Sequence, residues 1–365
     1  MRPASLLSLL LCGCAAHSLV GAPAVADLQL PRDHGAHPAQ TEWWHFHGHL
    51  TDSKGQVHDF FLGFVRWHTD ADRVLFFPVR LVVDPGQAAV FCVTSRDART
   101  YRGREKYAFP DVWAATAATG RLELTHDEWS VRATPAGMQL SASAKGAQLE
   151  LTLGDRDAPL VLEGKDGRFE DPPHLFYTLP RVPAVGTLTL DGERLEVRGD
   201  AWVKHEWGFL YTDAVAGWVW FGVQLDDGTE LQVGLIKDRQ WQPMGGSFAE
   251  LIDAKGGVER LELTQVGVVQ TGETWTSERS GLTWPVHWRL ELPGGRGSLE
   301  LSTTVPQQEL FAFPMPIWAG SYEVHGTVDG RAVRGSAMAE VFGLEQPFFR
   351  SFYHSGPPQA ARSTP

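Results

Sequence analysis

Residues 199–228, GDAWVKHEWGFLYTDAVAGWVWFGVQLDDG, decide the fold. The stretch contains two apolar segments with the alternation of β-strands, and the loop 212–217 between them predicts a joint between two similar halves. In the first segment a period of two places four side chains on one face: Val203, His205, Trp207 and Phe209. The opposite face carries Trp202, Lys204, Glu206 and Gly208. We therefore expect His205 among aromatic side chains, where loss of solvent lowers the pKa of an imidazole.

The same style of hairpin occurs in both halves of the chain. Segments 42–50 and 57–67 flank one polar turn, and segments 218–225 and 229–237 flank another that ends in glycine. Three apolar residues recur at one spacing in each half: Trp43, Phe46 and Leu50 in the first, Trp218, Phe221 and Leu225 in the second. Short strands with Gly and Pro turns predict an all-β chain of two tandem antiparallel barrels, at 28–212 and 213–352. In the first half, residues 112–118 are the one convincing helix candidate.

The charge balance limits the kinds of partner. The chain of 365 residues has 32 Lys and Arg against 44 Asp and Glu, a net charge of −12. This argues against nucleic acid or an anionic membrane surface as a partner, because both require a basic patch. A small barrel has room for one apolar ligand, so a hydrophobic small molecule is the expected partner. No glycine-rich phosphate loop or GxSxG motif occurs, and we expect no cofactor.

The N-terminus predicts export. Arg2 precedes the apolar run 6–12 and the small residues 13–16, so residues 1–16 have the pattern of a secretory signal peptide. Residues 11–14, LCGC, also resemble a bacterial lipobox with Cys14 as the lipidated residue. The expected location is therefore the periplasm or the outer membrane as a lipoprotein, or else the secreted fraction. The third cysteine, Cys92, leaves no basis for a disulfide framework.

Several motifs together resemble one known family, the lipocalin-like carotenoid 1,2-hydratase and AttH-type proteins. They are PRDHGAHP at 31–38, TEWWHFHGHL at 41–50, FYTLPRVPAVGTLTLDG at 176–192, GDAWVKHEWG at 199–208, WVWFGVQLDDGTEL at 218–231, TWPVHWRLELP at 283–293, and the pair Tyr322 and Glu323. The resemblance implies two lipocalin-like (calycin) barrels. In the hydratase branch it also implies addition of water to a terminal double bond of an acyclic carotenoid.

The chain departs from the family pattern at several positions. Lys204 stands where relatives commonly have Asp, and His45 and His47 stand where Tyr and Thr are usual. The strand after the DDG turn, LQVG at 231–234, lacks the acid of the hydratase branch. These departures weaken the hydratase expectation without affecting the fold.

Alkene hydration requires a proton donor, a positioned water and aromatic faces that stabilise a cation in a dry pocket. The candidates are His205 as donor, with Glu206 and Glu42 as its acid partners. The candidate substrate-binding residues are Trp43, Trp44, Trp207, Trp220, Tyr322 and Glu323. In the alternative interpretation His205 is a buried structural histidine and the tryptophans serve only in packing. Both interpretations predict that four tryptophans are buried: Trp43, Trp44, Trp207 and Trp220.

Glu42 shares the expected inward face of its strand with Trp44, Phe46 and Leu50. A carboxylate buried there requires a partner, because an unpaired buried charge is costly. The sequence offers three partners for it: Arg66, Arg80 and His205.

His45, His47 and His49 alternate and so project from one strand face. With His58 and Asp59 on the next strand they could form a metal site. We favour an exposed polar face instead and expect no metal.

Two functions remain open. One is an enzyme such as a hydratase acting on a polyene or isoprenoid-like substrate, and the other is a non-catalytic carrier lipoprotein with the same cavity. His205 and Glu206 pointing together into a cavity would favour the enzyme.

Overall fold

The computed structural model describes residues 28–39, 41–67, 86–108, 115–154, 160–161, 168–170, 173–208, 215–303, 305–312 and 315–343. Within these ranges helix is limited to three short 3₁₀ turns: η1 (Arg32–His34), η2 (Leu263–Gln265) and η3 (Pro293–Gly295). None of the described helices is long and apolar enough to cross a membrane. The expected signal peptide with Cys14, and Arg80, lie outside the described residues.

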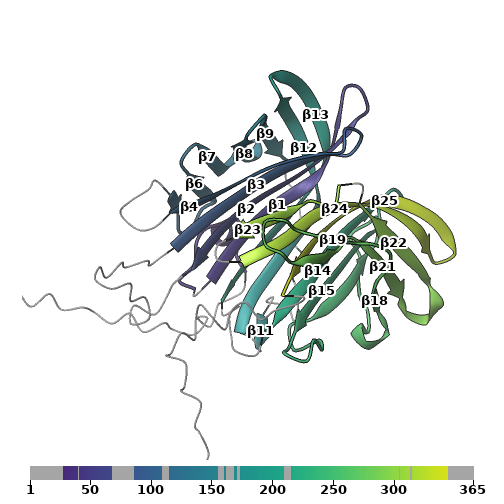
Figure 1. The fold of residues 1–365 in the computed structure, drawn as a ribbon. Helices are drawn as coiled ribbons and strands as arrows, with labels where there is room; N and C mark the ends of the chain where they lie inside the picture. Colours follow the sequence, from purple (N-terminus) through teal and green to yellow (C-terminus); the bar gives the residue numbers. More distant parts are fainter. Residues whose placement is uncertain are drawn as a thin grey trace, which may run out of the picture.

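The first sheet contains thirteen strands, all paired antiparallel, in the order β4-β3-β2-β1-β13-β12-β9-β8-β7-β6-β5, with β10 and β11 also on β12. Its strands are β1 (Thr41–Asp52), β2 (Val57–Trp67), β3 (Gly86–Ser95), β4 (Thr100–Ala108), β5 (Ala115–Ala117), β6 (Glu123–His126), β7 (Trp129–Thr134), β8 (Gly137–Ala144), β9 (Ala147–Leu153), β10 (Leu160–Val161), β11 (Arg168–Glu170), β12 (Pro173–Leu190) and β13 (Glu193–Gly208). The sheet curls into a nearly closed barrel (Figure 1).

The second sheet contains ten strands in the order β17-β16-β15-β14-β25-β24-β22-β21-β18, with β23 also on β24. Its strands are β14 (Gly217–Leu225), β15 (Glu230–Lys237), β16 (Phe248–Ile252), β17 (Val258–Arg260), β18 (Gly267–Gln270), β21 (His287–Leu292), β22 (Gly297–Ser302), β23 (Glu309–Ala312), β24 (Met315–Val328) and β25 (Arg331–Phe342). β19 (Thr274–Thr276) and β20 (Thr283–Pro285) form a separate pair. The second sheet is a half-barrel, and the prediction of an all-β chain of two tandem lipocalin-like barrels is confirmed at this level.

The two sheets repeat one topology. The first strand of each sheet pairs with the next strand in sequence and with the last strand of the same sheet: β1 with β2 and β13, and β14 with β15 and β25. The residues matched by spacing also have matching environments. Phe46 and Phe221 pack inside their own sheets, whereas Trp43 and Trp218 pack between the two sheets.

Three apolar cores result from this arrangement. One lies inside each curled sheet and the third lies between the sheets, where β1, β2 and β3 contact β14, β23, β24 and β25. β1 is therefore covered on both faces, and nearly all its residues are buried. The four tryptophans expected to be buried are so, with relative exposures of 2% for Trp43, 1% for Trp44, 0% for Trp207 and 4% for Trp220.

Two local predictions differ from the structure. In the expected helix 112–118 residues 115–118 are described, and Ala115–Ala117 form the strand β5, which pairs with β6 because sheet pairing overrides the weak helix preference of three residues. The apolar pattern of residues 259–269 predicts one continuous strand, but the structure interrupts it: β17 ends at Arg260, η2 follows, and β18 begins at Gly267.

Candidate functional site

β13 places chemically active side chains on both of its faces. His205 and Trp207 point into the first barrel, where His205 contacts Glu42 and Trp207 belongs to the core. Lys204 and Glu206 point the other way and line a pocket between the two sheets. The alternation of a strand produces this separation, and it creates two distinct polar sites.

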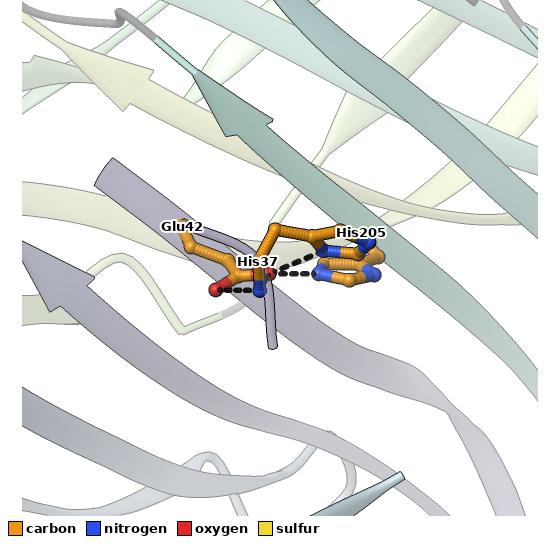
Figure 2. A group of neighbouring side chains, drawn as sticks. All are labelled: His37, Glu42 and His205. Atoms are coloured by element: carbon orange, nitrogen blue, oxygen red, sulfur yellow. Dashed lines mark hydrogen bonds and ion pairs between the residues drawn. The ribbon is translucent and has the colours of Figure 1, made fainter. Parts of the chain in front are cut away.

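The site inside the first barrel is a network around Glu42 (Figure 2). Oε1 of Glu42 lies 3.0 Å from Nε2 of His205 and 2.8 Å from Nδ1 of His37. The backbone N–H of His37 donates to both carboxylate oxygens, and Arg66 donates to Oε2 at 3.1 Å. Of the partners expected for Glu42, Arg66 and His205 therefore both contact it. We call His37, Glu42 and His205 the His205 cluster.

Aromatic rings enclose the His205 cluster. The ring of His37 stacks on Trp207 at 3.9 Å between centroids, and the ring of His205 stacks on Trp44 at 4.8 Å. Burial lowers the pKa of His205 against the opposing effect of Glu42. Burial would raise the pKa of Glu42, but hydrogen bonds from His205 and His37 hold it below its usual value.

Both ring nitrogens of His205 face oxygen acceptors. Nδ1 lies 3.0 Å from the backbone carbonyl oxygen of Asp33, and Nε2 lies 3.0 Å from Oε1 of Glu42. A neutral imidazole has one N–H and donates to one of these oxygens, whereas the protonated ring donates to both. Burial favours the neutral ring, and Glu42 favours the protonated one.

The His205 cluster contains ligand atom types that zinc accepts, and these atoms lie within 4.8 Å of one another. Both oxygens of Glu42, however, already accept hydrogen bonds, and the Arg66 guanidinium supplies the positive charge that balances the carboxylate. In this structure the cluster is a hydrogen-bonded network.

The second site is a pocket between the sheets, which we call the inter-sheet pocket. Its empty volume, including the mouth that opens to solvent, is about 620 Å³, of which about 60 Å³ can hold the centre of a water molecule. Its aromatic walls are Trp43, Phe176, Trp218, Trp220 and Phe248. The polar residues in the pocket wall are His174, Lys204, Glu206 and Glu340.

Lys204 and Glu340 form an ion pair in the pocket wall. Nζ of Lys204 lies 2.8 Å from Oε1 of Glu340, and Nδ1 of His45 lies 3.0 Å from the same oxygen. The Lys204 ammonium also lies over the ring of Trp220, 3.9 Å from its centroid. Burial alone would raise the pKa of Glu340, but His45 and Lys204 outweigh burial and hold it well below its usual value.

Glu206 differs from Glu340 because no hydrogen bond or ion pair from the described residues stabilises its charge. Burial raises the pKa of Glu206 to about 7, with Glu340 adding to the rise and Lys204 opposing it. A carboxyl group with such a pKa is present in both protonation states near neutral pH, which is the requirement for a general acid or base.

The sequence-predicted site residues divide between these two places. Glu42, Trp44, His205 and Trp207 meet inside the first barrel, and Trp43, Glu206 and Trp220 line the inter-sheet pocket. Tyr322 lies in the second core, where its hydroxyl accepts from Nε1 of Trp288 at 3.1 Å, and the exposed Glu323 lies next to it. Neither lines the pocket.

The expectation that Glu206 partners His205 does not match the geometry, because adjacent strand residues point to opposite faces. Sequence reasoning missed His37 in the first site and Glu340 in the second, and it did not assign Lys204 and His45 to the pocket. For Lys204 a signal existed, because it shares a strand face with Glu206.

The prediction that His45, His47 and His49 form an exposed face is wrong. His45 and His47 are 5% and 1% exposed, because the second sheet covers this face of β1. His45 binds Glu340, His47 packs against Phe61 and Trp202, and His49 binds Asp59 at 2.5 Å. The three histidines do not converge on one point.

Two curled antiparallel sheets with polar groups in and between them define a protein of the lipocalin-like class. The chain belongs to the AttH-like family, which matches residues 22–344. No functionally curated protein matches it.

Three solved structures show the same fold. An AttH-type protein of Nitrosomonas europaea is 24% identical, with a TM-score of 0.73 over 89% of this chain and 99% of that one. Kievitone hydratase of Nectria haematococca is 15% identical, with a TM-score of 0.69 over 90% and 97%. CghA with Sch210972 is also 15% identical, with a TM-score of 0.59 over 90% and 96%.

Proposed function

We propose that this protein is a hydratase that adds water to a carbon–carbon double bond of a hydrophobic molecule held in the inter-sheet pocket. The observation that carries the proposal is Glu206, a carboxyl group with a pKa of about 7 in a pocket with mainly aromatic walls. The likeness to kievitone hydratase supports the same class of reaction on this fold.

The chemistry assigned to Glu206 is proton transfer. In its protonated form one carboxyl oxygen delivers a proton to a carbon of the double bond, and the other oxygen takes a proton from the water that bonds to the neighbouring carbon. Trp43 and Trp218 exclude bulk water and position the apolar substrate. General acid–base catalysis of this kind contributes about 10²–10⁴-fold to the rate.

The His205 cluster has a supporting role in this proposal. It lies on the other face of β13 and joins β13 to β1 through His205 and Glu42, so it fixes the strands that present Glu206 and Trp43 to the pocket. His205 and Glu42 then act as positioning residues.

The export of the protein and its lipid anchor at Cys14 are part of the same proposal. The leader-like residues 1–16 support both. A hydratase for apolar compounds outside the cytoplasm would meet substrates that partition into membranes.

The test uses a panel of small apolar alkenes in isotope-labelled water. It includes benzylideneacetone, with a double bond conjugated to a ketone, and prenylbenzene, with an isolated double bond. Mass spectrometry measures the label incorporated by the wild type, by Glu206→Gln, and by Glu196→Gln as an exposed control on the same strand.

We expect label in at least one alkene with the wild type and the control, and a loss of about 10²–10⁴-fold with Glu206→Gln. Absence of label in every alkene would overturn the hydratase proposal. Binding without turnover, seen as quenching of the pocket tryptophans, would then favour the carrier.

A further inference from the structure

Lys204 carries more hydrogen-bond donors than the described part of the chain accepts from it. An ammonium group has three N–H bonds. Among the described residues its one hydrogen-bond acceptor is Oε1 of Glu340, at 2.8 Å, and it also faces the rings of Trp220 and Phe176. Lys204 is only 4% exposed and lines the inter-sheet pocket. No second oxygen acceptor from the described residues reaches Lys204, and a ligand can supply one.

A pure hydrocarbon substrate fits poorly against Lys204 in the inter-sheet pocket. It would cover the remaining N–H groups of Lys204 without accepting from them, and buried unsatisfied donors are costly. Hydration of an isolated alkene also passes through a carbocation. The Trp220 face that could stabilise such a cation is already occupied by the ammonium group, which repels positive charge.

An oxygen that gains negative charge during the reaction fits the same wall well. Lys204 donates to it, and Glu340 with His45 holds Lys204 in place through the 2.8 Å and 3.0 Å contacts. Lys204 and Glu206 are two residues apart on one face of β13, a rise of about 6.6 Å along the strand. This spacing accommodates a carbonyl oxygen at one side chain and the α-carbon of the same molecule at the other.

We propose that the substrate is an α,β-unsaturated carbonyl compound and that Lys204 binds its carbonyl oxygen. This inference rests on the proposed hydratase function and names the substrate class of the same site. It replaces the isolated double bond of a carotenoid with a double bond conjugated to a carbonyl group.

The reaction balances without any further reagent. The oxygen of water bonds to the β-carbon, and the π electrons of the double bond move to form an enolate whose oxygen accepts from Lys204. The α-carbon takes the proton of the Glu206 carboxyl group. The proton released by the water passes to the other oxygen of Glu206, which restores the acid. The product is a β-hydroxy carbonyl compound.

The first measurement is spectroscopic and does not depend on turnover. Benzylideneacetone bound to the wild type should absorb at longer wavelength than in solution, because an ammonium group polarises its carbonyl. Lys204→Met should abolish the shift, and Lys54→Met, at an exposed lysine, should retain it. Absence of the shift in the wild type, or its persistence in Lys204→Met, would overturn the inference.

Removal of Lys204 leaves Glu340 buried without its ion-pair partner, which threatens folding. Two further variants avoid this problem. Glu340→Gln keeps Lys204 and should retain the shift, whereas the double variant Lys204→Met with Glu340→Gln should lose it. Circular dichroism and thermal melting confirm that each variant is folded before its spectrum is compared.

The second measurement is hydration of the two probe alkenes. The wild type should hydrate benzylideneacetone in preference to prenylbenzene, and Lys204→Met should lose about 10²–10³-fold, the usual cost of removing one donor to a developing oxyanion. Hydration of prenylbenzene alone would overturn the inference and leave the hydratase function standing. A Lys204-dependent spectral shift without hydration of either probe would support the ligand class and overturn the hydratase function.

Discussion

His205 and Glu206 are consecutive residues of β13, and their side chains lie on opposite faces of the first sheet. Nε2 of His205 lies 3.0 Å from Oε1 of Glu42 inside the barrel, and Glu206 lines the pocket between the sheets. One strand thus connects a buried polar network to a candidate reaction site. The network links β13 to β1 through side chains, and the pocket is the candidate binding site.

The pH dependence of hydration tests the role of Glu206. Because the protonated carboxyl group is the proton donor and its pKa is about 7, kcat/KM should decline above about pH 7, by about tenfold per pH unit. The charged groups that face it are Lys204 and Glu340. Initial rates over a pH series provide the profile, and a rate that rises through this range would assign Glu206 the role of a base.

The stability of the fold should also respond to Glu206. Its pKa in the folded protein, about 7, lies above the ordinary value of 4.5, so ionisation is costlier in the folded than in the unfolded state. The wild type should therefore lose stability as pH rises from about 4.5 to about 7, by up to about 3 kcal/mol. Glu206→Gln should lack this slope in urea unfolding. Equal slopes in the two proteins would contradict the burial of this carboxyl group.

Glu42→Ala should destabilise the protein by about 3–5 kcal/mol, because Arg66 and the two histidines lose a buried partner. The control Glu193→Ala removes an exposed ion pair with Lys54 and should leave stability nearly unchanged. The pKa of Glu42 is lowered in the fold, so its contribution is present above about pH 4.5 and disappears as pH falls. Urea unfolding at two pH values measures both effects, and a cost equal to that of the control would refute the network.

Trp207→Ala should cost about 3–5 kcal/mol, because the side chain is 0% exposed and stacks on His37. The control is Val258→Ala, at a residue that is 46% exposed, where the change should be within about 0.5 kcal/mol. Denaturant unfolding followed by circular dichroism compares the two. Equal stabilities would show that the stacked ring contributes no packing energy.

Radiolabelled palmitate tests the N-terminus. The label should enter the wild type and Cys12→Ala but not Cys14→Ala if the lipobox is used. Label retained in Cys14→Ala would exclude lipidation at this residue and leave simple secretion as the explanation for residues 1–16.

Much of the fold could be predicted because strand alternation and turn residues are local properties. The hairpin of β1 and β2, the strand from Trp218 to Leu225 and the inward face of Glu42 and Trp44 all follow from a period of two. The sequence also predicts His205 and Arg66 as possible partners of Glu42, since a buried carboxylate requires a partner. The errors at 112–118 and at the histidine face arose where a short local signal competed with pairing or packing from distant segments.

The sequence by itself determined which side chains share a face and which apolar residues must be buried. Only the tertiary structure decided what covers each face. Glu340 lies 136 residues from Lys204 and 295 from His45, yet all three meet because the second sheet packs on the outer face of the first. A period of two assigns a side chain to one side of a sheet, but the layer that packs there depends on long-range contacts. The burial that gives Glu206 its raised pKa comes from that packing.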